Sequence, residues 1–592
     1  MQYGALRAAP FSSNRAEAVA HSVSPRPGQG NCYPKALIPR AERRNEKVKM
    51  RMQGRPGILG GLFVAAMLTA ALIGIFFFAW RVAGLPFVPF DTFDWQTRVL
   101  PGRVIAFGIG HMVTLIRALR LGPTATTAKA AEQAMAIAGL FIVGVVGGFV
   151  VFLILRAARR AHGLAAGLAL GVVLGVPAML ITLHGSGTTS VGPAAGAVWV
   201  LGAFLVWGAV LGRAEQRVIG IEKPNGAATE APVERVDRRR FLIRLGGTAA
   251  VITVAGAVVG ELAEARRREV VMLAGGEPVR WSATHPLPNA TAAVQPASGT
   301  RPEFTPLDRH YRIDINTIPP KIDERQWSLK VSGLVEKPLT LTLQDLKSYD
   351  PMHQFITLSC ISNPVGGDLI GTQRWTGVSL QSLLPDWRLK PGATHLKIRS
   401  ADQFFEVVSL DAIKADPRIM LTYAWDGVPL LREHGFPLRI YIPDIHGMKQ
   451  PKWIESVEAT ERWQPGYWVE RGWNKVAQIH ATSVIDTIAV DMTLIGADHR
   501  KLVPIGGIAH AGARGISRVE VQTDGGPWEL AELRTPVSQL TWVIWRYDWP
   551  YQPGKHTFTV RCYDGNGTPQ IAAPSPPEPN GATGLHSKSM ML

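Results

Sequence analysis

The segment FITLSCISNPVGGD, residues 355–368, sets a single cysteine, Cys360, between a β-rich run and a glycine-rich turn. Such a run delivers the thiol to the end of a strand, and glycines in the turn let a large ligand approach the backbone closely. A lone thiol in this place is either a small buried hydrophobic side chain or a thiolate bound to a soft metal. The spacing alone leaves both interpretations open.

Two basic segments follow this cysteine along the chain: HGFPLRIYIP, residues 434–443, and GMKQPKWI, residues 447–454. Together with the cysteine segment and its continuation GTQRWTGV, residues 371–378, they resemble the sulfite oxidase superfamily of molybdopterin enzymes. The resemblance runs from residue 301 to residue 570. It implies that Cys360 is the catalytic thiolate and the single protein ligand of molybdenum, whose other ligands are oxo or hydroxo groups and the pterin dithiolene.

The resemblance also implies a molybdenum–molybdopterin cofactor held by basic and amide side chains. A pterin with a terminal phosphate needs cationic donors on rigid strands, and arginine and lysine supply charge-assisted hydrogen bonds there. The residues expected to bind the cofactor are Asn316, His434, Arg439, Lys449, Gln450 and Lys452. For Lys449 and Gln450, a solvated surface position is an equal alternative.

The chain departs from sulfite oxidases at the positions that bind the substrate. Those enzymes bring two arginines and a tyrosine to the anion, whereas here the alignment puts Asp314 and Val365 at the arginine positions and Trp473 in the tyrosine segment. We assign Trp473 to the catalytic site on this basis, with aromatic core packing as the alternative. A sulfite dianion needs desolvated cationic partners, so the replacements predict that sulfite is a poor substrate.

The composition points to a membrane segment joined to a globular part. The 592 residues are 46% hydrophobic and 18% charged, too apolar for one water-soluble enzyme and too polar for a transporter embedded throughout. Apolar runs that could cross a bilayer as helices are Gly57–Trp80, Ala134–Leu155, Gly163–Leu183, Gly192–Leu211 and the shorter Leu245–Leu262. Apolar and basic residues interleave between the first two runs, which predicts an interfacial amphipathic helix there.

Basic flanks predict the orientation of these helices. The net charge is +17, and residues 1–56 form a basic arm, unless translation starts further on at Met50 or Met52. The positive-inside rule places the N-terminus in the cytoplasm and the catalytic domain outside the inner membrane of a bacterium. The segment DRRRFL, residues 237–242, resembles a twin-arginine export signal ahead of the fifth run. An ordinary last helix with basic flanks is the alternative.

The predicted fold is an all-α transmembrane region of four or five helices, an α+β sulfite-oxidase-type molybdopterin domain and an all-β immunoglobulin-like sandwich. The segments are a basic disordered arm (1–56), a transmembrane region (57–262), a linker (263–300), the molybdopterin domain (301–480), the sandwich (481–573) and a loose proline-rich tail (574–592). By the resemblance, the sandwich corresponds to a dimerisation domain, so a homodimer is expected.

The resemblance implies oxo-atom transfer to or from a small-molecule substrate. The three cysteines, at 32, 360 and 562, form no C-x-x-C motif, which argues against a cysteine-held cluster or attached haem c. Electrons therefore pass to or from an external carrier, either a protein of the cytochrome c type or a quinone. No nucleic-acid motif accompanies the basic residues. Two alternatives stay open: a reductase of S-oxides or N-oxides, and a membrane interaction protein that has lost catalysis.

Overall fold

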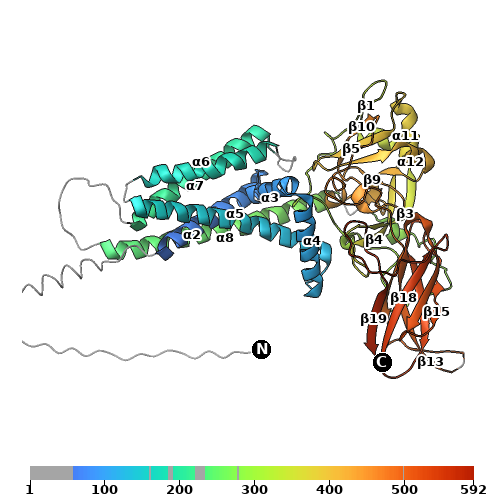
Figure 1. Ribbon diagram of the computed structural model, residues 1–592. Helices are drawn as coiled ribbons and strands as arrows, with labels where there is room; N and C mark the ends of the chain where they lie inside the picture. The colour runs from blue at the N-terminus through green and yellow to red at the C-terminus, as the bar shows by residue number, and fades with distance from the viewer. Residues whose placement is uncertain are drawn as a thin grey trace, which may run out of the picture. The chain divides into compact units, whose positions relative to one another are not determined.

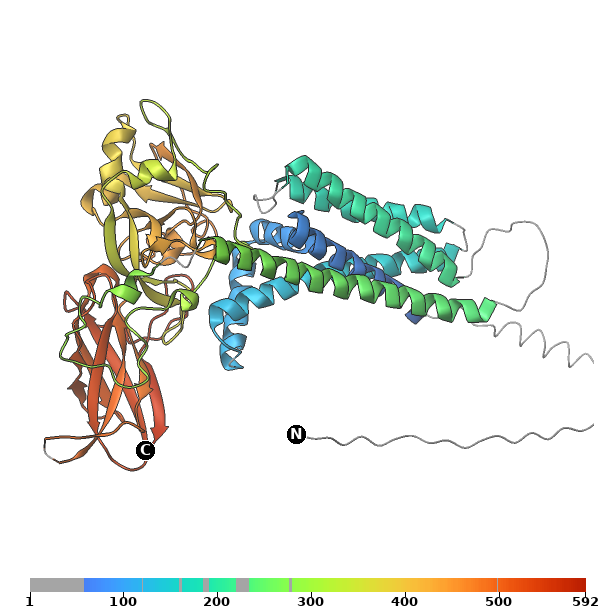
Figure 2. The ribbon, with the colours of Figure 1, turned by 180° about the vertical axis from the view of Figure 1, so that it is seen from behind.

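The computed structural model describes residues 58–119, 121–158, 162–184, 191–219, 234–275, 279–497 and 499–592. The predicted basic arm, with Cys32, lies outside these residues. Five described helices are long and apolar enough to cross a membrane, as the apolar runs predicted. They are α2 (Ile58–Ala83), α5 (Thr124–Ala158), α6 (Gly163–His184), α7 (Pro193–Ile219) and the Arg240–Gly260 part of α8 (Glu234–Gly275). Figure 2 shows α8 as one long helix.

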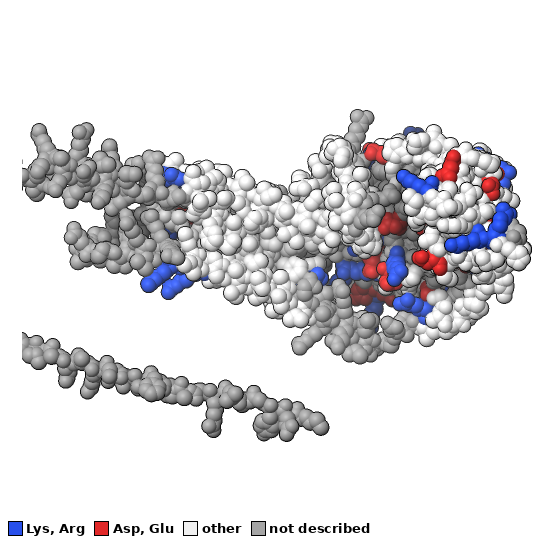
Figure 3. All heavy atoms as spheres, turned by 90° about the horizontal axis from the view of Figure 1, so that it is seen from below, with Lys and Arg blue, Asp and Glu red and all other residues white. Residues whose placement is uncertain are grey.

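Two shorter helices, α3 (Val88–Val99) and α4 (Gly102–Ala118), fill the segment where one interfacial helix was predicted. Pro101 separates them and ends α3, because the residue before a proline disfavours helical geometry. The surface of the helical region is almost free of charge in Figure 3, whereas charged residues gather over the β-rich part. This contrast is typical of a membrane segment attached to a globular part.

Helices α6 and α7 pack through glycines. Gly163, Gly167 and Gly171 recur at four-residue intervals on α6, and Gly208 and Gly212 of α7 face them. A Cβ atom added at Gly167 would overlap the backbone oxygen of Gly208. Small residues at such spacing let two membrane helices approach closely.

Substituting leucine at Gly167 should therefore separate α6 from α7 and destabilise the chain by roughly 1–3 kcal/mol, as overpacking does elsewhere. Gly202 on α7 is a matched control, because an added Cβ there meets no atom within 4 Å. Thermal unfolding in detergent should show a lower Tm for Gly167→Leu and an unchanged Tm for Gly202→Leu. Equal Tm values for the two variants would contradict the glycine contact.

Two sheets form the domain that follows the membrane helices (Figure 1). The first sheet has the order β2 (Leu339–Leu341), β1 (Leu329–Gly333), β10 (Ile454–Thr460), β5 (His395–Ser400) and β6 (Phe405–Ser409). The second has the order β3 (Met352–Ser359), β4 (Ile370–Ser379), β7 (Met420–Trp425) and β8 (Val428–Pro429), with β9 (Arg439–Tyr441) paired to β7. The short helices are α10 (Leu343–Lys347), α11 (Leu380–Trp387) and α12 (Leu410–Ala415).

One hydrophobic core joins these two sheets. It contains Leu329 and Ile398 of the first sheet, Leu421 and Ile440 of the second, and Trp387 at the end of α11. All five side chains are fully buried. Burying one large apolar side chain contributes roughly 1.5–3 kcal/mol, so this core fixes β9, which carries Arg439, against the first sheet.

A β-sandwich follows from Thr482, next to the predicted boundary at 481. One sheet has β11 (Thr482–Ile488), β13 (Lys501–His510), β17 (Val543–Pro550) and β16 (Glu532–Leu533), with β12 (Leu494–Ile495) paired to β13. The other has β15 (Trp528–Leu530), β14 (Ile516–Thr523), β18 (Lys555–Asp564) and β19 (His586–Met591). Residues of both sheets, such as Trp545 and Phe558, share one buried core. The immunoglobulin-like topology itself stays a prediction.

The structure differs from the sequence-based expectation at two connecting segments. Residues 586–591 of the predicted loose tail form β19, because an alternating segment after the prolines pairs with the edge of β18. The described part of the predicted linker is packed on the domains: α9 (Trp281–Thr284) is held by Asp426, and Asn289 is buried beside Arg534. Sequence analysis did not predict this packing, because it depends on side-chain hydrogen bonds and leaves no periodic pattern of hydrophobic residues.

Candidate functional site

Cys360 directly follows β3 and is buried. Its backbone N–H donates to the Leu369 oxygen over 3.0 Å, which closes the glycine-rich turn onto the strand end. Its Sγ lies 3.0 Å from the Ser362 Oγ. Burial raises the pKa of the thiol, an effect that the Ser362 contact only partly offsets. A thiolate at this position therefore needs a cation, such as a bound metal, beside it.

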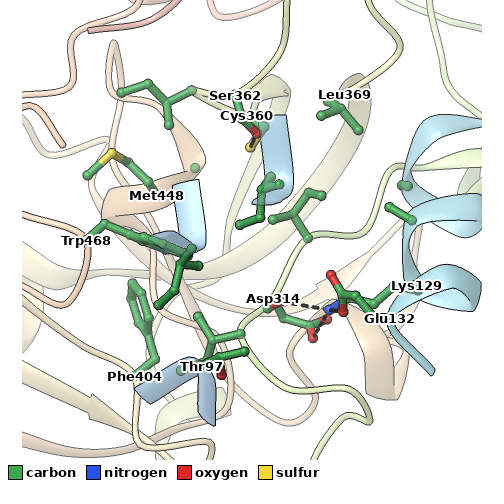
Figure 4. A pocket seen from close by; sticks show the side chains of 18 of the residues that line it. Thr97, Lys129, Glu132, Asp314, Cys360, Ser362, Leu369, Phe404, Met448 and Trp468 are labelled. Carbon is green, nitrogen blue, oxygen red and sulfur yellow. Dashed lines mark hydrogen bonds and ion pairs between the residues drawn. The ribbon is translucent and has the colours of Figure 1, made fainter. Parts of the chain in front are cut away.

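The thiol faces a cavity of about 400 Å³. Figure 4 shows Cys360, Ser362 and Leu369 on one side of this cavity and Met448, Trp468 and Phe404 on another. Helices α3, α4 and α5 contribute further wall residues, among them Thr97, Lys129 and Glu132. The cavity is therefore shared between the β-rich domain and the membrane region.

Three of the predicted cofactor ligands lie together on this wall: His434, Arg439 and Lys452. The Arg439 guanidinium donates to the His434 backbone oxygen over 3.2 Å and lies over the Trp375 ring. Burial lowers the pKa of Arg439 to about 10 and that of Lys452 to about 8. Burial and the neighbouring cations hold the pKa of His434 well below its usual value, so its imidazole is neutral at pH 7. These groups form a buried basic pocket beside the thiol.

Asp314 also lines the cavity and is the centre of an ion network. Its carboxylate lies 3.3 Å from Lys129 Nζ of α5, 2.7 Å from Arg312 Nε and 3.4 Å from Lys452 Nζ. Glu132 accepts from Lys129 over 2.7 Å, as Figure 4 shows. Burial would raise the pKa of Asp314, but the three cations outweigh it and hold this pKa far below its ordinary value. The carboxylate therefore stays ionised.

Gln450 and Trp473 also line the cavity, and each carries a buried polar atom without a hydrogen-bond partner. Gln450 Nε2 donates to the Ile445 oxygen over 2.8 Å, whereas Gln450 Oε1 has no hydrogen-bond partner. Trp473 Nε1 is likewise unpaired. A buried polar atom without a partner costs roughly 1–3 kcal/mol, so these atoms indicate places where a ligand can donate or accept a hydrogen bond. Trp473 also packs on Met448, which matches the core-packing alternative.

Three positions singled out from the sequence do not line the cavity. Lys449 turns to the buried Glu406, whose Oε1 its Nζ contacts over 2.5 Å. Asn316 is buried behind the wall and accepts from Arg98 of α3 over 2.6 Å. Val365 lies across the glycine-rich turn and packs near Val484 of the sandwich. A sequence alignment identifies the motif but does not show which of its side chains point into the cavity and which point away from it.

The wall residues that sequence analysis missed include Tyr311, Lys129, Glu132 and Asp402. Tyr311 packs directly on Cys360, and burial raises its pKa well above the usual value. Lys129 and Glu132 precede an apolar run, where they read as an ordinary polar flank. Their charges in the first turns of the mainly apolar α5 could have indicated a site, because charged residues in a membrane helix need partners.

Part of this chain is similar in sequence to known proteins. Residues 316–468 match the family model "Oxidoreductase molybdopterin binding domain". The chain is 24% identical over 267 residues to sulfite oxidase of Arabidopsis thaliana, covering 38% of this chain and 68% of that protein. It is 25% identical over 306 residues to inducible nitrate reductase [NADH] 2 of Glycine max, covering 43% of this chain and 33% of that protein.

Residues 316–468 thus match the molybdopterin-binding oxidoreductase family, and the chain is similar to the sulfite oxidase superfamily. The resemblance predicted from the cysteine segment is thereby confirmed. A further relative is YedZ1 of Azospira oryzae, named as a candidate subunit of a protein-methionine-sulfoxide reductase. It is 29% identical over 187 residues, 32% of this chain and 68% of that protein. The chain spans about a third of the length of the nitrate reductases that it matches.

The superfamily implies a molybdenum–molybdopterin cofactor, and the cavity residues fit it. The Cys360 thiol is a soft donor for molybdenum. Arg439 and Lys452 supply buried positive charge for a phosphate, and the unpaired Gln450 Oε1 can accept from a pterin N–H. The residues that would hold the group are therefore Cys360, His434, Arg439, Gln450 and Lys452, without Lys449 and Asn316 in direct contact.

Replacing Lys449 by methionine should act on stability and leave cofactor content unchanged. Removing one partner of a buried ion pair costs roughly 3–5 kcal/mol, and the Glu406 partner here is fully buried. Lys449→Met should lower the Tm, and adding Glu406→Gln should restore most of the loss. Molybdenum per protein should equal that of the wild type in every variant that folds. Loss of molybdenum from a variant with wild-type Tm would assign Lys449 to the cofactor instead.

Proposed function

We propose that this chain is a membrane-anchored oxidoreductase that transfers an oxygen atom to or from a small-molecule substrate at a molybdenum bound by Cys360. The observation that carries the proposal is the buried Cys360 thiol, which shares one cavity wall with the cations Arg439 and Lys452. When bound, the cofactor supplies two-electron oxo-atom chemistry, and the protein supplies binding, orientation and electrostatics. This function rests on the similarity to molybdopterin oxidoreductases together with the cavity.

The residues of the chain have separate tasks in this proposal. Arg439 and Lys452 bind the anionic end of the pterin, and the neutral His434 donates or accepts a hydrogen bond without adding charge. Met448, Trp468 and Trp473 line the cavity with apolar surface and keep water out of it. Water exclusion strengthens the electrostatic interactions within the site. Trp473 is thereby a wall of the catalytic site.

The proposal includes an external electron carrier, either a protein of the cytochrome c type or a quinone. It places the chain in a bacterial inner membrane, with the N-terminus in the cytoplasm and the catalytic domain outside. The five apolar helices and the likeness to YedZ1 support a membrane location in a bacterium. The twin-arginine-like segment 237–242 would serve this export, and the β-sandwich would pair two copies of the chain.

A second candidate is a reductase of neutral S-oxides or N-oxides. The cavity wall near the thiol is largely apolar, with Leu358, Ile361, Leu369 and Met448 among its residues. Asp314 and Glu132 both form ion pairs with the ammonium group of Lys129. An anionic substrate would have to compete with these carboxylates for this cation. An uncharged oxide is therefore a better match to this wall than a dianion. The name of YedZ1 points to the same chemistry.

Cys360→Ser tests the metal assignment against a matched control. Cys562 is the other free thiol in the described residues and lies buried in the sandwich. The wild type and Cys562→Ser, purified with an intact molybdopterin pathway, should contain one molybdenum each. Cys360→Ser should lose one molybdenum–sulfur contribution from its X-ray absorption spectrum. A chain without molybdenum in all three forms would instead support the non-catalytic interaction protein.

Sulfite should be a poor substrate because carboxylates already engage two cations of the cavity, Lys129 and Lys452. One lost charge contact of about 1.4 kcal/mol corresponds to roughly tenfold in rate or affinity. Sulfite-dependent reduction of ferricyanide should therefore be at least about tenfold slower than oxidation of reduced methyl viologen by dimethyl sulfoxide or trimethylamine N-oxide. Faster turnover of sulfite, abolished in Cys360→Ser, would overturn this prediction.

A further inference from the structure

The cavity beside Cys360 continues along a wall made by membrane-region helices. One face of α4 lines it with apolar side chains at helical spacing: Val104, Ile105, Ile109, Met112 and Val113. Ala125, Ala128 and Met135 of α5 complete this part of the wall. The cavity therefore has an apolar part, lined by these side chains of α4 and α5, that no step of the oxo-transfer chemistry requires, and a polar part lined by Asp402 and Trp473 of the β-rich domain.

The apolar part reaches the level at which α5 becomes a membrane span. Its wall on α5 extends from Thr124 to Met135, about 16 Å at 1.5 Å per residue. The polar residues Lys129 and Glu132 lie before Met135, and the uninterrupted apolar sequence of α5 begins after it. On α4, Phe107 and Leu115 lie outside the cavity wall and are 65% and 57% exposed. Helix α4 thus offers apolar side chains both to the cavity and to a bilayer surface.

The polar part carries an unpaired, buried donor that suits an uncharged head group. Trp473 Nε1 can donate a hydrogen bond to a ring oxygen, and its side chain is 8% exposed. Asp402 also lines the cavity and can accept a proton. Burial raises the pKa of Asp402 to about 7, which suits a carboxyl that exchanges protons near neutral pH.

We propose that an isoprenoid quinol enters this cavity from the bilayer, with its ring at the polar part and its hydrocarbon tail along α4. The proposal deepens the proposed function, on which it rests, by naming the electron carrier. A carrier protein could not enter a cavity of this size, whereas a flat ring with an apolar tail matches its two parts. The described residues contain no group of three or more His, Cys, Asp or Glu that could hold a relay metal.

The two half-reactions balance without another reactant. A quinol oxidised in the cavity becomes a quinone and releases two electrons and two protons. An S-oxide or N-oxide reduced by the same protein takes up two electrons and two protons, breaks its bond to oxygen and releases that oxygen as water. Asp402 receives the two phenolic protons one after the other, and the reverse sequence applies if the substrate is oxidised. The membrane region is then the entry site for reducing equivalents as well as an anchor.

The test uses the full chain with its cofactor in lipid nanodiscs and two readouts. A photoreactive azidoquinone is cross-linked and its attachment sites are mapped by mass spectrometry. In parallel, molybdenum reduction by decylubiquinol is followed by electron paramagnetic resonance, with dithionite as a donor that needs no binding site. We expect saturable labelling on α4 or the first turns of α5, suppressed by decylubiquinone, and reduction of molybdenum by both donors.

Variants on the two faces of α4 make the test specific. Ile109→Glu puts a charge into the cavity, and Leu115→Glu puts the same charge on α4 outside it. Ile109→Glu should lower both labelling and reduction by decylubiquinol at least about tenfold, a difference of about 1.4 kcal/mol, and leave reduction by dithionite unchanged. Leu115→Glu should behave as the wild type. Ile109→Trp fills the cavity without a charge and replaces Ile109→Glu if that variant fails to fold.

The possible results separate this inference from the proposed function. Labelling elsewhere, or equal effects of the two glutamates, would overturn the quinol site, and so would molybdenum reduced by dithionite but never by decylubiquinol. A chain without molybdenum that still shows saturable labelling on α4 would overturn the proposed oxidoreductase and retain the quinone site. Loss of both readouts would overturn both.

Discussion

The buried carboxylate of Asp314 determines how the two parts of the candidate site meet. It is contacted by Lys129 from α5, by Arg312 two residues before it, and by Lys452 from the segment before β10. A buried carboxylate is stable only when cations compensate its desolvation. Removing any one of these cations would leave uncompensated charge. The network therefore requires the first turns of α5 to stay against the molybdopterin domain.

Other polar contacts also join the membrane-region helices to the molybdopterin domain. Asp94 of α3 accepts from the Thr317 backbone and side chain, and the Thr124 N–H at the start of α5 donates to Asp368 over 2.7 Å. Asp368 belongs to the glycine-rich segment that follows Cys360. The helices thus hold the loop of the proposed metal ligand from the membrane side. A membrane region that only anchored the domain would need none of these buried polar contacts.

Much of the fold was predictable because its signals are local. The five apolar runs identified five helices, and the cysteine and basic segments identified the superfamily. His434, Arg439 and Lys452 were placed at the cavity from the same motifs. Lys129 was missed because its partner Asp314 lies 185 residues further along the chain. A periodic sequence pattern does not indicate an ion pair between residues so far apart. In the sequence, Asp314 indicated only that an arginine of sulfite oxidases is replaced.

Side-chain direction accounts for the other differences. Lys449 and Gln450 are neighbours in one motif, but only Gln450 faces the cavity, because the 3₁₀ turn at 447–449 directs Lys449 to Glu406. Asn316 is near the cofactor pocket in sequence, yet Arg98 holds it behind the wall. Family motifs therefore located the pocket, and the fold decided which members of each motif face it.

The central claim is that membrane helices and the Cys360 loop form one site, and a cross-link between them tests it most directly. Thr124→Cys and Asp368→Cys are combined in a chain whose Cys32 and Cys562 are replaced by serine, with Asp368→Cys alone as the control. A short bismaleimide reagent is applied in native membranes, and the chain is then cut at a protease site inserted within residues 220–233. The account predicts that the two fragments stay joined only when both cysteines are present. Fragments that separate in the double variant would contradict it.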